Sequence, residues 1–209
     1  MSVDMFFYLG IMNHLVVRYR SPTRRVVLSH RYHGTMIQCA DGLWNQRARK
    51  LIEELVGGEL VDEFTRPGGV RRHRRNCPFT REVLRDIALI AVGLHGSPQL
   101  NLVNHCNCAD YGGQIHDLAT QEQMHTTDLL MVGQMFRREL PLEIARFMAL
   151  SDCELASHYR AAVSILDVRR NLDQAMTRPL GIRSFWLRPS DLDGNQAPAL
   201  QDCTLYELE

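Results

Sequence analysis

The sequence predicts an α/β fold with a parallel-core β-sheet flanked by helices. Short apolar runs typical of buried strands alternate with longer segments whose apolar residues recur at helical spacing. Such alternation favours parallel strands that are joined by crossover helices. Polar motifs follow two of the predicted strands, and the carboxyl ends of parallel strands are where ligands bind in such sheets. We therefore expect a functional site at that edge of the sheet.

The first half of the chain supplies three strand candidates and two helix candidates. Apolar residues at helical spacing predict a helix over 44–56, and Gly57 and Gly58 give it a typical end. A strongly amphipathic helix is predicted over 79–96, after the turn-like sequence RPGGV. The strand candidates lie before, between and after these helices, at residues 34–39, 59–64 and 99–105.

The second half is predicted to be mostly helical, with two strands at its end. We expect Pro141 to interrupt the helical region, because proline has no main-chain N–H to donate. Helical patterns cover residues 119–140, 142–150 and 154–176. Strand patterns cover residues 182–188 and 204–209, with the turn-like sequence DLDGN between them.

The chain is predicted to form one domain that follows an N-terminal arm. Its 209 residues, 45% of them hydrophobic, are enough to bury a substantial core. Residues 1–33 carry two β-favouring pieces split by SPT, which predicts a hairpin or an arm swapped between subunits. No repeat or low-complexity linker divides residues 34–209, so we expect a single α/β domain there.

Charge and cysteine content narrow the classes of function. The 24 basic and 24 acidic residues cancel, so no overall field attracts nucleic acid or an anionic membrane. No apolar run approaches the length of about 18 residues that a membrane span needs. Six irregularly spaced cysteines do not resemble a disulfide framework and are interpreted as reduced thiols. We expect a cytoplasmic protein.

The sequence NLVNHCNCADYGG places a histidine and two cysteines at the end of a predicted strand. His105, Cys106 and Cys108 occur there, while Cys39 and Asp41 follow the strand at residues 34–39. If the two strands are neighbours, these side chains converge. Two thiolates and one imidazole are a familiar zinc set, with a fourth tetrahedral position left for water or another ligand. Cys106 stays an alternative ligand in place of Cys108.

The two motifs together resemble those of the β-class carbonic anhydrases. A cysteine, any residue and an aspartate are followed 66 residues later (105 minus 39) by His-x-x-Cys. The sequence PGGVR is similar to a glycine-bearing loop of that family, and the likeness extends over roughly residues 35–195. The resemblance implies zinc held by Cys39, His105 and Cys108, and Cys106 as a small packed residue. It also implies interconversion of carbon dioxide and bicarbonate by a homodimer or an assembly of dimers.

The sequence departs from the family pattern beside the first motif. Leu43 stands where the family has an arginine that holds the catalytic aspartate, here Asp41, away from zinc. Without that arginine, we expect Asp41 to become the fourth ligand and close the site. Arg47, one helical turn further on, is an alternative partner for Asp41, although a solvated helix residue is the favoured interpretation.

Main-chain amides near the glycines are the predicted contacts for bicarbonate. Such amides bind anions where successive N–H groups point into a concave turn. Ala109 stands where family members commonly have glycine, and an ordinary turn is the alternative interpretation. The predicted substrate-binding residues are Gly68, Gly69, Ala109, Gly112 and Gly113.

Several functions stay open at this stage. Besides the zinc lyase, the alternatives are a non-catalytic zinc protein of the same fold and a hydrolase of a small carbon–sulfur substrate. A weaker alternative is nucleic-acid binding by the basic run 71–75, which is better interpreted as a solvated loop or a surface for a partner subunit. His116 and His125 are expected to be partly buried structural residues, with proton shuttling as the alternative.

Overall fold

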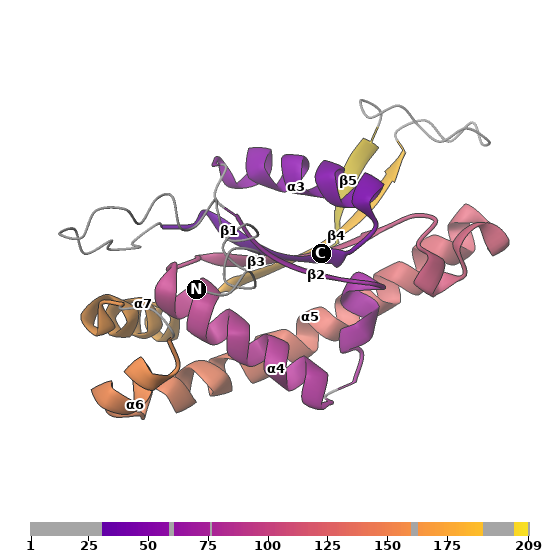
Figure 1. The fold of residues 1–209 in the computed structure, drawn as a ribbon. Coiled ribbons are helices and arrows are strands. Elements are labelled where there is room, and N and C mark those ends of the chain that lie inside the picture. The colour runs from indigo at the N-terminus through magenta and orange to yellow at the C-terminus, as the bar shows by residue number, and fades with distance from the viewer. Residues whose placement is uncertain (1–30, 59–60, 76, 160–162, 190–202, 209) are drawn as a thin grey trace, which may run out of the picture.

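The computed structural model shows one β-sheet with helices on both faces (Figure 1). It describes residues 31–58, 61–75, 77–159, 163–189 and 203–208. The predicted arm over residues 1–33 lies outside the described residues apart from its last three, and the predicted turn DLDGN lies outside them entirely. The hairpin, the arm and this turn therefore stay predictions. No helix in the described residues is long and apolar enough to cross a membrane.

Within the described residues, the sheet has five strands in the order β2-β1-β3-β4-β5. The first four lie parallel, and β5 pairs antiparallel with β4. Ile37 lies opposite Leu102, which makes β1 and β3 direct neighbours and brings their carboxyl ends to one edge. This arrangement confirms the predicted fold class. The strands are β1 (Gly34–Cys39), β2 (Val61–Arg66), β3 (Gln99–His105), β4 (Gly181–Pro189) and β5 (Cys203–Leu208).

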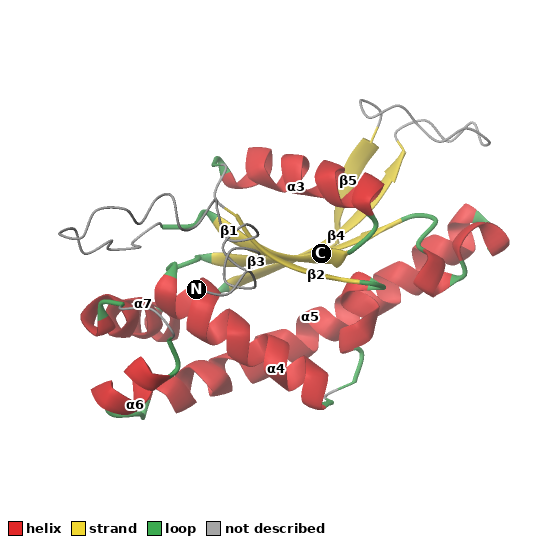
Figure 2. Ribbon diagram, in the orientation of Figure 1, coloured by secondary structure: helices red, strands yellow, loops and turns green. Residues whose placement is uncertain are grey.

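Helix α3 (Gly42–Val56) covers one face of the sheet, and the remaining helices cover the other (Figure 2). The predicted helix over 79–96 is confirmed, and its second half, Ile87–Leu94, winds as a π-helix. The predicted helical segment 154–176 contains two helices instead of one. The helices of the second face are α4 (Pro78–Asp86), α5 (Leu118–Met148), α6 (Asp152–Ser157) and α7 (Ile165–Thr177).

The two faces of the sheet carry separate apolar clusters. Successive side chains of a strand point to opposite faces, so Met36 packs with Trp44 and Ile52 under α3. Its neighbour Ile37 packs into the cluster on the opposite face, where Leu102 also lies. Both faces of β1 and β3 are therefore buried, and their buried residues include polar ones such as Thr35 and Asn101.

Pro141 does not interrupt the helical region, contrary to the prediction. Helix α5 continues from Leu118 to Met148 with Pro141 inside it. A proline in a helix interior costs about 3 kcal/mol, because it removes one hydrogen bond and crowds the preceding turn. Leu140, Ile144 and Phe147 flank the proline and are buried in the core. The burial of these side chains offsets the cost of the proline. The missing N–H of Pro141, on which the prediction rested, gives no information about this burial.

Candidate metal centre

Three buried side chains meet at the carboxyl edge of β1 and β3. Cys39 is the last residue of β1, His105 is the last residue of β3, and Cys108 lies in the loop that follows. One ligand atom from each lies within 4.8 Å of the others. All three residues are at least nine-tenths buried. Within the described residues, this is the group of metal-ligating side chains that could hold an ion.

The spacing of the two thiols suits one tetrahedral ion. Cys39 Sγ and Cys108 Sγ lie 3.7 Å apart. Two sulfurs, each about 2.3 Å from a tetrahedral zinc, would be about 3.8 Å apart. Both cysteines are free, and their separation exceeds the length of about 2.05 Å of a disulfide bond.

The ring of His105 is oriented as a metal ligand is. Its Nδ1 lies 2.7 Å from the carbonyl oxygen of Cys106, while its buried Nε2 has no hydrogen-bond partner. An imidazole that donates Nδ1–H to a carbonyl presents the lone pair of Nε2, which is the usual arrangement for a metal-bound histidine. Trp44 stacks on the ring, with the ring centres 5.4 Å apart. A metal ion would give the unpartnered nitrogen a bond.

The two thiols favour different protonation states before any metal binds. A hydrogen bond from Cys108 is the largest cause that lowers the pKa of Cys39 to about 4, although burial opposes it. His105 and the main-chain N–H of Asp41 also stabilise this thiolate. The same pairing, together with burial, raises the pKa of Cys108. The pairing therefore favours a thiolate on Cys39, and a metal that binds both sulfurs would release the proton that they share.

Cys106 lies apart from this group. Its side chain is buried in the apolar cluster under α3, together with Val103 and Trp44. Its contribution to the centre comes from the carbonyl oxygen that fixes the ring of His105. The placement agrees with the interpretation of Cys106 as a small packed residue.

The structure leaves the predicted role of Asp41 untested and changes the interpretation of Arg47. The exposed side chain of Asp41 is not a member of the three-ligand group, so the closed arrangement stays a prediction. Arg47 is only 5% exposed, and the interpretation as a solvated residue is wrong. Its guanidinium carbon lies 5.3 Å from the ring centre of Trp44, three residues earlier on the same helix. The favourable contact of a cation with an aromatic ring contributes to this burial. The three-residue spacing of Trp44 and Arg47 places both side chains on the same face of a helix, and it could have indicated this contact from the sequence.

The glycine-bearing loop packs directly against the end of β1. Gly68 and Gly69 adopt positive φ angles of 75° and 48°, which favour glycine. A Cβ atom on Gly69 would lie 2.8 Å from the main-chain nitrogen of Cys39, and one on Gly68 would overlap the carboxylate of Asp110. The loop thus positions the metal-binding residues. A direct role of these glycines in substrate binding stays a prediction.

Main-chain N–H groups in the turn after Cys108 donate hydrogen bonds to carbonyl groups of the same turn. The N–H groups of Tyr111 and Gly113 donate to the carbonyl of Cys108 at 2.9 Å, and the N–H of Gly112 donates to Ala109 at 3.0 Å. An anion could reach the amides of Gly112 or Gly113 only if these bonds broke. The ordinary turn, which was the alternative interpretation, fits this geometry better.

Residues 29–138 match the model of a protein family described as putative carbonic anhydrase. The match covers more than half of the chain. The chain belongs to this carbonic anhydrase family. The finding confirms the resemblance that the two motifs of the sequence indicated. A comparison with curated proteins found no match.

Solved structures of β-carbonic anhydrases are also similar to this family member, at low identity. A tetrameric enzyme from Sordaria macrospora is 12% identical over 88% of this chain and 92% of its own, with a TM-score of 0.35. The enzyme of Aspergillus fumigatus is 12% identical over 99% of this chain and 91% of its own, with a TM-score of 0.38. Isoform I from Trichomonas vaginalis is 14% identical over 90% and 93%, with a TM-score of 0.35.

A buried histidine lies close to the candidate metal centre of this carbonic anhydrase family member. The ring of His125 packs against Tyr111 and Trp186, at centre distances of 3.6 and 4.4 Å. Its side chain is fully buried, and neither ring nitrogen has a hydrogen-bond partner. Burial is the main cause that lowers the pKa of His125 to about 3, with smaller contributions from His105 and Arg71. A neutral structural role therefore fits better than proton shuttling.

Replacing Gly69 with alanine is expected to destabilise the chain by at least about 2 kcal/mol and to weaken metal binding. The new Cβ would be strained at this φ angle and would press against the main chain of Cys39. Gly42→Ala is the matched control, because a Cβ there meets nothing within 4 Å. Urea unfolding and zinc titration measure both effects. Equal stability of the two variants would contradict the positioning role of the loop.

Proposed function

We propose that this protein is a zinc-dependent carbonic anhydrase that interconverts carbon dioxide and bicarbonate. The observation that carries the proposal is the convergence of Cys39, His105 and Cys108 in a chain of the carbonic anhydrase family. Two thiolates and one imidazole suit zinc and leave a fourth tetrahedral position for another ligand. When bound, zinc supplies a Lewis acid that activates water near neutral pH.

The residues of the chain would hold the ion and limit the access of solvent to it. Tyr111 and Met124 pack against the two thiols, and Trp44 covers the ring of His105. An apolar shell of this kind strengthens electrostatic interactions inside a site. We assign to Asp41 the catalytic carboxylate, which acts beside the ligands in an open site or becomes the fourth ligand in a closed one.

A carbon dioxide hydration assay tests the proposed function. The rate of pH change after rapid mixing should rise in proportion to the zinc content of the protein and should fall after treatment with a chelator. Zinc-loaded protein with a rate no higher than buffer would favour the alternative of a non-catalytic zinc protein with the same fold. Hydrolysis of a small carbon–sulfur substrate by such inactive protein would instead favour the other alternative.

If Asp41 closes the metal site in the unaltered chain, replacing Leu43 with arginine should raise the hydration rate. An arginine two residues after Asp41 can pair with its carboxylate and keep it from the metal, as the family pattern implies. Gln46→Arg is the control, because it adds the same charge to an exposed position of helix α3. If the unaltered chain is already fully active and Leu43→Arg changes nothing, the closed arrangement is wrong.

We also propose that the protein is cytoplasmic and that it assembles into a homodimer or a larger group of dimers. The relative from Sordaria macrospora is described as tetrameric. Helix α5 also exposes large apolar side chains at Leu130, Met131 and Leu142, by 40%, 46% and 54%. Exposed apolar surface of this kind is common where subunits meet. Light scattering at micromolar concentration should give the mass of at least two chains, and a monomeric mass would contradict the assembly.

A further inference from the structure

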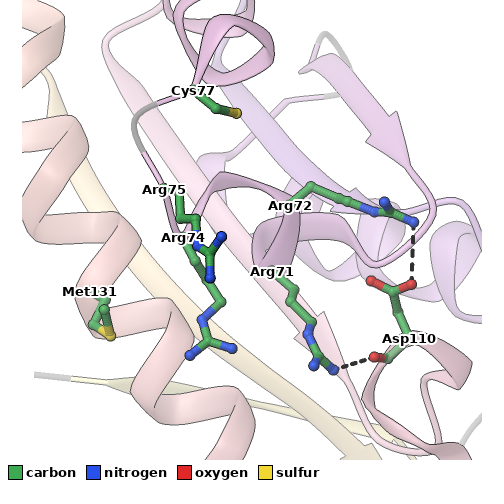
Figure 3. Close-up of a pocket in the computed structure, with 7 residues that line it drawn as sticks. All are labelled: Arg71, Arg72, Arg74, Arg75, Cys77, Asp110 and Met131. Atoms are coloured by element: carbon green, nitrogen blue, oxygen red, sulfur yellow. Dashed lines mark hydrogen bonds and ion pairs between the residues drawn. The ribbon is translucent and has the colours of Figure 1, made fainter.

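A pocket lined by arginines lies between the loop that follows β2 and helix α5 (Figure 3). Its volume is about 590 Å³, and none of its lining residues is one of the three candidate metal ligands. Four guanidinium groups and a single carboxylate face it. The lining residues are Arg71, Arg72, Arg74, Arg75, Cys77, Asp110 and Met131.

Two of the four arginines are neutralised by acidic partners. Arg72 Nη2 lies 3.3 Å from Asp110 Oδ1, and Arg74 Nε lies 2.8 Å from Asp128 Oδ1. The side chain of Asp128 is 3% exposed, so the pair with Arg74 is shielded from water on its acidic side. These two pairs add no net charge to the pocket.

The other two arginines keep their positive charge. Arg71 donates to the main-chain carbonyl of Asp110, which is a neutral acceptor, and its guanidinium carbon lies 4.8 Å from the ring centre of Tyr111. These contacts hold Arg71 in place without neutralising it. The exposed side chain of Arg75 makes no hydrogen bond or ion pair with any residue that the structure describes. The pocket therefore has a net charge of about two positive units.

The basic run is more ordered than a solvated loop. His73, at its centre, is 1% exposed, and Arg74 pairs with a buried carboxylate. These anchors fix the backbone from which the neighbouring arginines extend into the pocket. Arg71, which its contacts with Asp110 and Tyr111 already hold in place, loses less side-chain entropy when an anion binds.

We propose that this pocket binds the phosphate group of a small phosphorylated molecule. A phosphate monoester carries about −1.5 to −2 charges at neutral pH, which matches the two uncompensated arginines. Guanidinium groups also present paired N–H donors that suit phosphate oxygens. The pocket falls within the range of roughly 300 to 1,000 Å³ that is usual for small-molecule sites, so it has room for the body of the ligand as well.

The lining favours a small ligand over nucleic acid. Single-stranded nucleic acid usually binds where aromatic side chains stack on its bases, and no aromatic residue lines this pocket. The site does not depend on the proposed hydration activity, because it needs neither the metal nor its ligands.

Isothermal titration calorimetry with the full chain tests the proposal. The probes are inorganic phosphate and glucose 6-phosphate, with glucose as the uncharged control and with constant ionic strength. We expect saturable binding of glucose 6-phosphate and inorganic phosphate at one site, and no binding of glucose. Arg75→Gln should weaken both phosphate affinities about tenfold. Arg81→Gln removes the same charge from an exposed position of α4 outside the pocket and should leave the affinities unchanged within about twofold.

Alkylation of Cys77 gives a second readout at the pocket itself. Glucose 6-phosphate at a concentration near its dissociation constant for the unaltered chain should slow the reaction of Cys77 with iodoacetamide, followed by mass spectrometry. Arg75→Gln should reduce this protection at the same concentration. The absence of saturable binding, or equal weakening by Arg75→Gln and Arg81→Gln, would overturn the proposal. So would an oligonucleotide that displaces glucose 6-phosphate at equal phosphate concentration. A change in assembly mass caused by Arg75→Gln with unchanged phosphate affinity would assign this surface to a subunit contact instead.

Discussion

Replacing Cys108 with serine is expected to abolish the proposed binding of zinc, whereas replacing Cys106 with serine is expected to preserve it. The sulfur of Cys108 belongs to the group whose ligand atoms lie within 4.8 Å of one another. The side chain of Cys106 packs in the apolar cluster under α3 instead. A serine hydroxyl keeps its proton near neutral pH and is a poor substitute for a thiolate ligand. The zinc content measured by elemental analysis should fall from about one ion per chain in the unaltered protein to below about 0.1 in Cys108→Ser.

The two serine variants also separate loss of metal from loss of fold. Because a site of this kind is assembled only in the folded chain, the free energy of metal binding adds to the stability of the fold. A chelator should lower the unfolding midpoint of the unaltered chain and of Cys106→Ser, but should not lower that of Cys108→Ser further. If Cys108→Ser keeps its zinc while Cys106→Ser loses it, the assignment of the second cysteine ligand is reversed.

The sequence was sufficient to predict the parallel sheet and the meeting of the two motifs. The alternation of short strand patterns with longer helical patterns restricts the topology to a few arrangements. The position of Cys39 and His105 at strand ends then required only that β1 and β3 be neighbours, which the register confirms. Local sequence patterns are sufficient to place these motifs, because each motif directly follows or ends a β-strand.

Features that depend on packing between distant elements could not be predicted from those patterns. The continuity of α5 through Pro141 depends on side chains packed in the core. The full burial of His125 depends on Tyr111 and Trp186, which are 14 and 61 residues away in the sequence (125 minus 111, 186 minus 125). No local periodicity contains that information.

The folded chain is expected to be less stable at pH 5.5 than at pH 7.5 by about 3 kcal/mol, because of two buried histidines. Burial is the main cause that lowers the pKa of His73 to about 4 and that of His125 to about 3. In the unfolded chain, both imidazoles take up protons near pH 6.5. Between pH 6.5 and 4, the unfolded state therefore binds more protons than the folded state. The free energy of unfolding is highest above pH 6.5 and falls as the pH decreases through this window, by about 1.4 kcal/mol for each histidine at pH 5.5.

Phenylalanine substitutions test the origin of this pH dependence. His125→Phe and His73→Phe keep a ring of similar shape but cannot bind a proton, so each should remove about half of the difference in unfolding free energy between pH 7.5 and pH 5.5. His158→Phe is the control, because His158 is partly exposed and packs edge-on against Phe147. Guanidinium unfolding at the two pH values gives the free energies, and the comparison between variants cancels the protonation of the metal ligands, which all of them share. An unchanged pH dependence in both buried-site variants would show that other groups cause the loss of stability in acid.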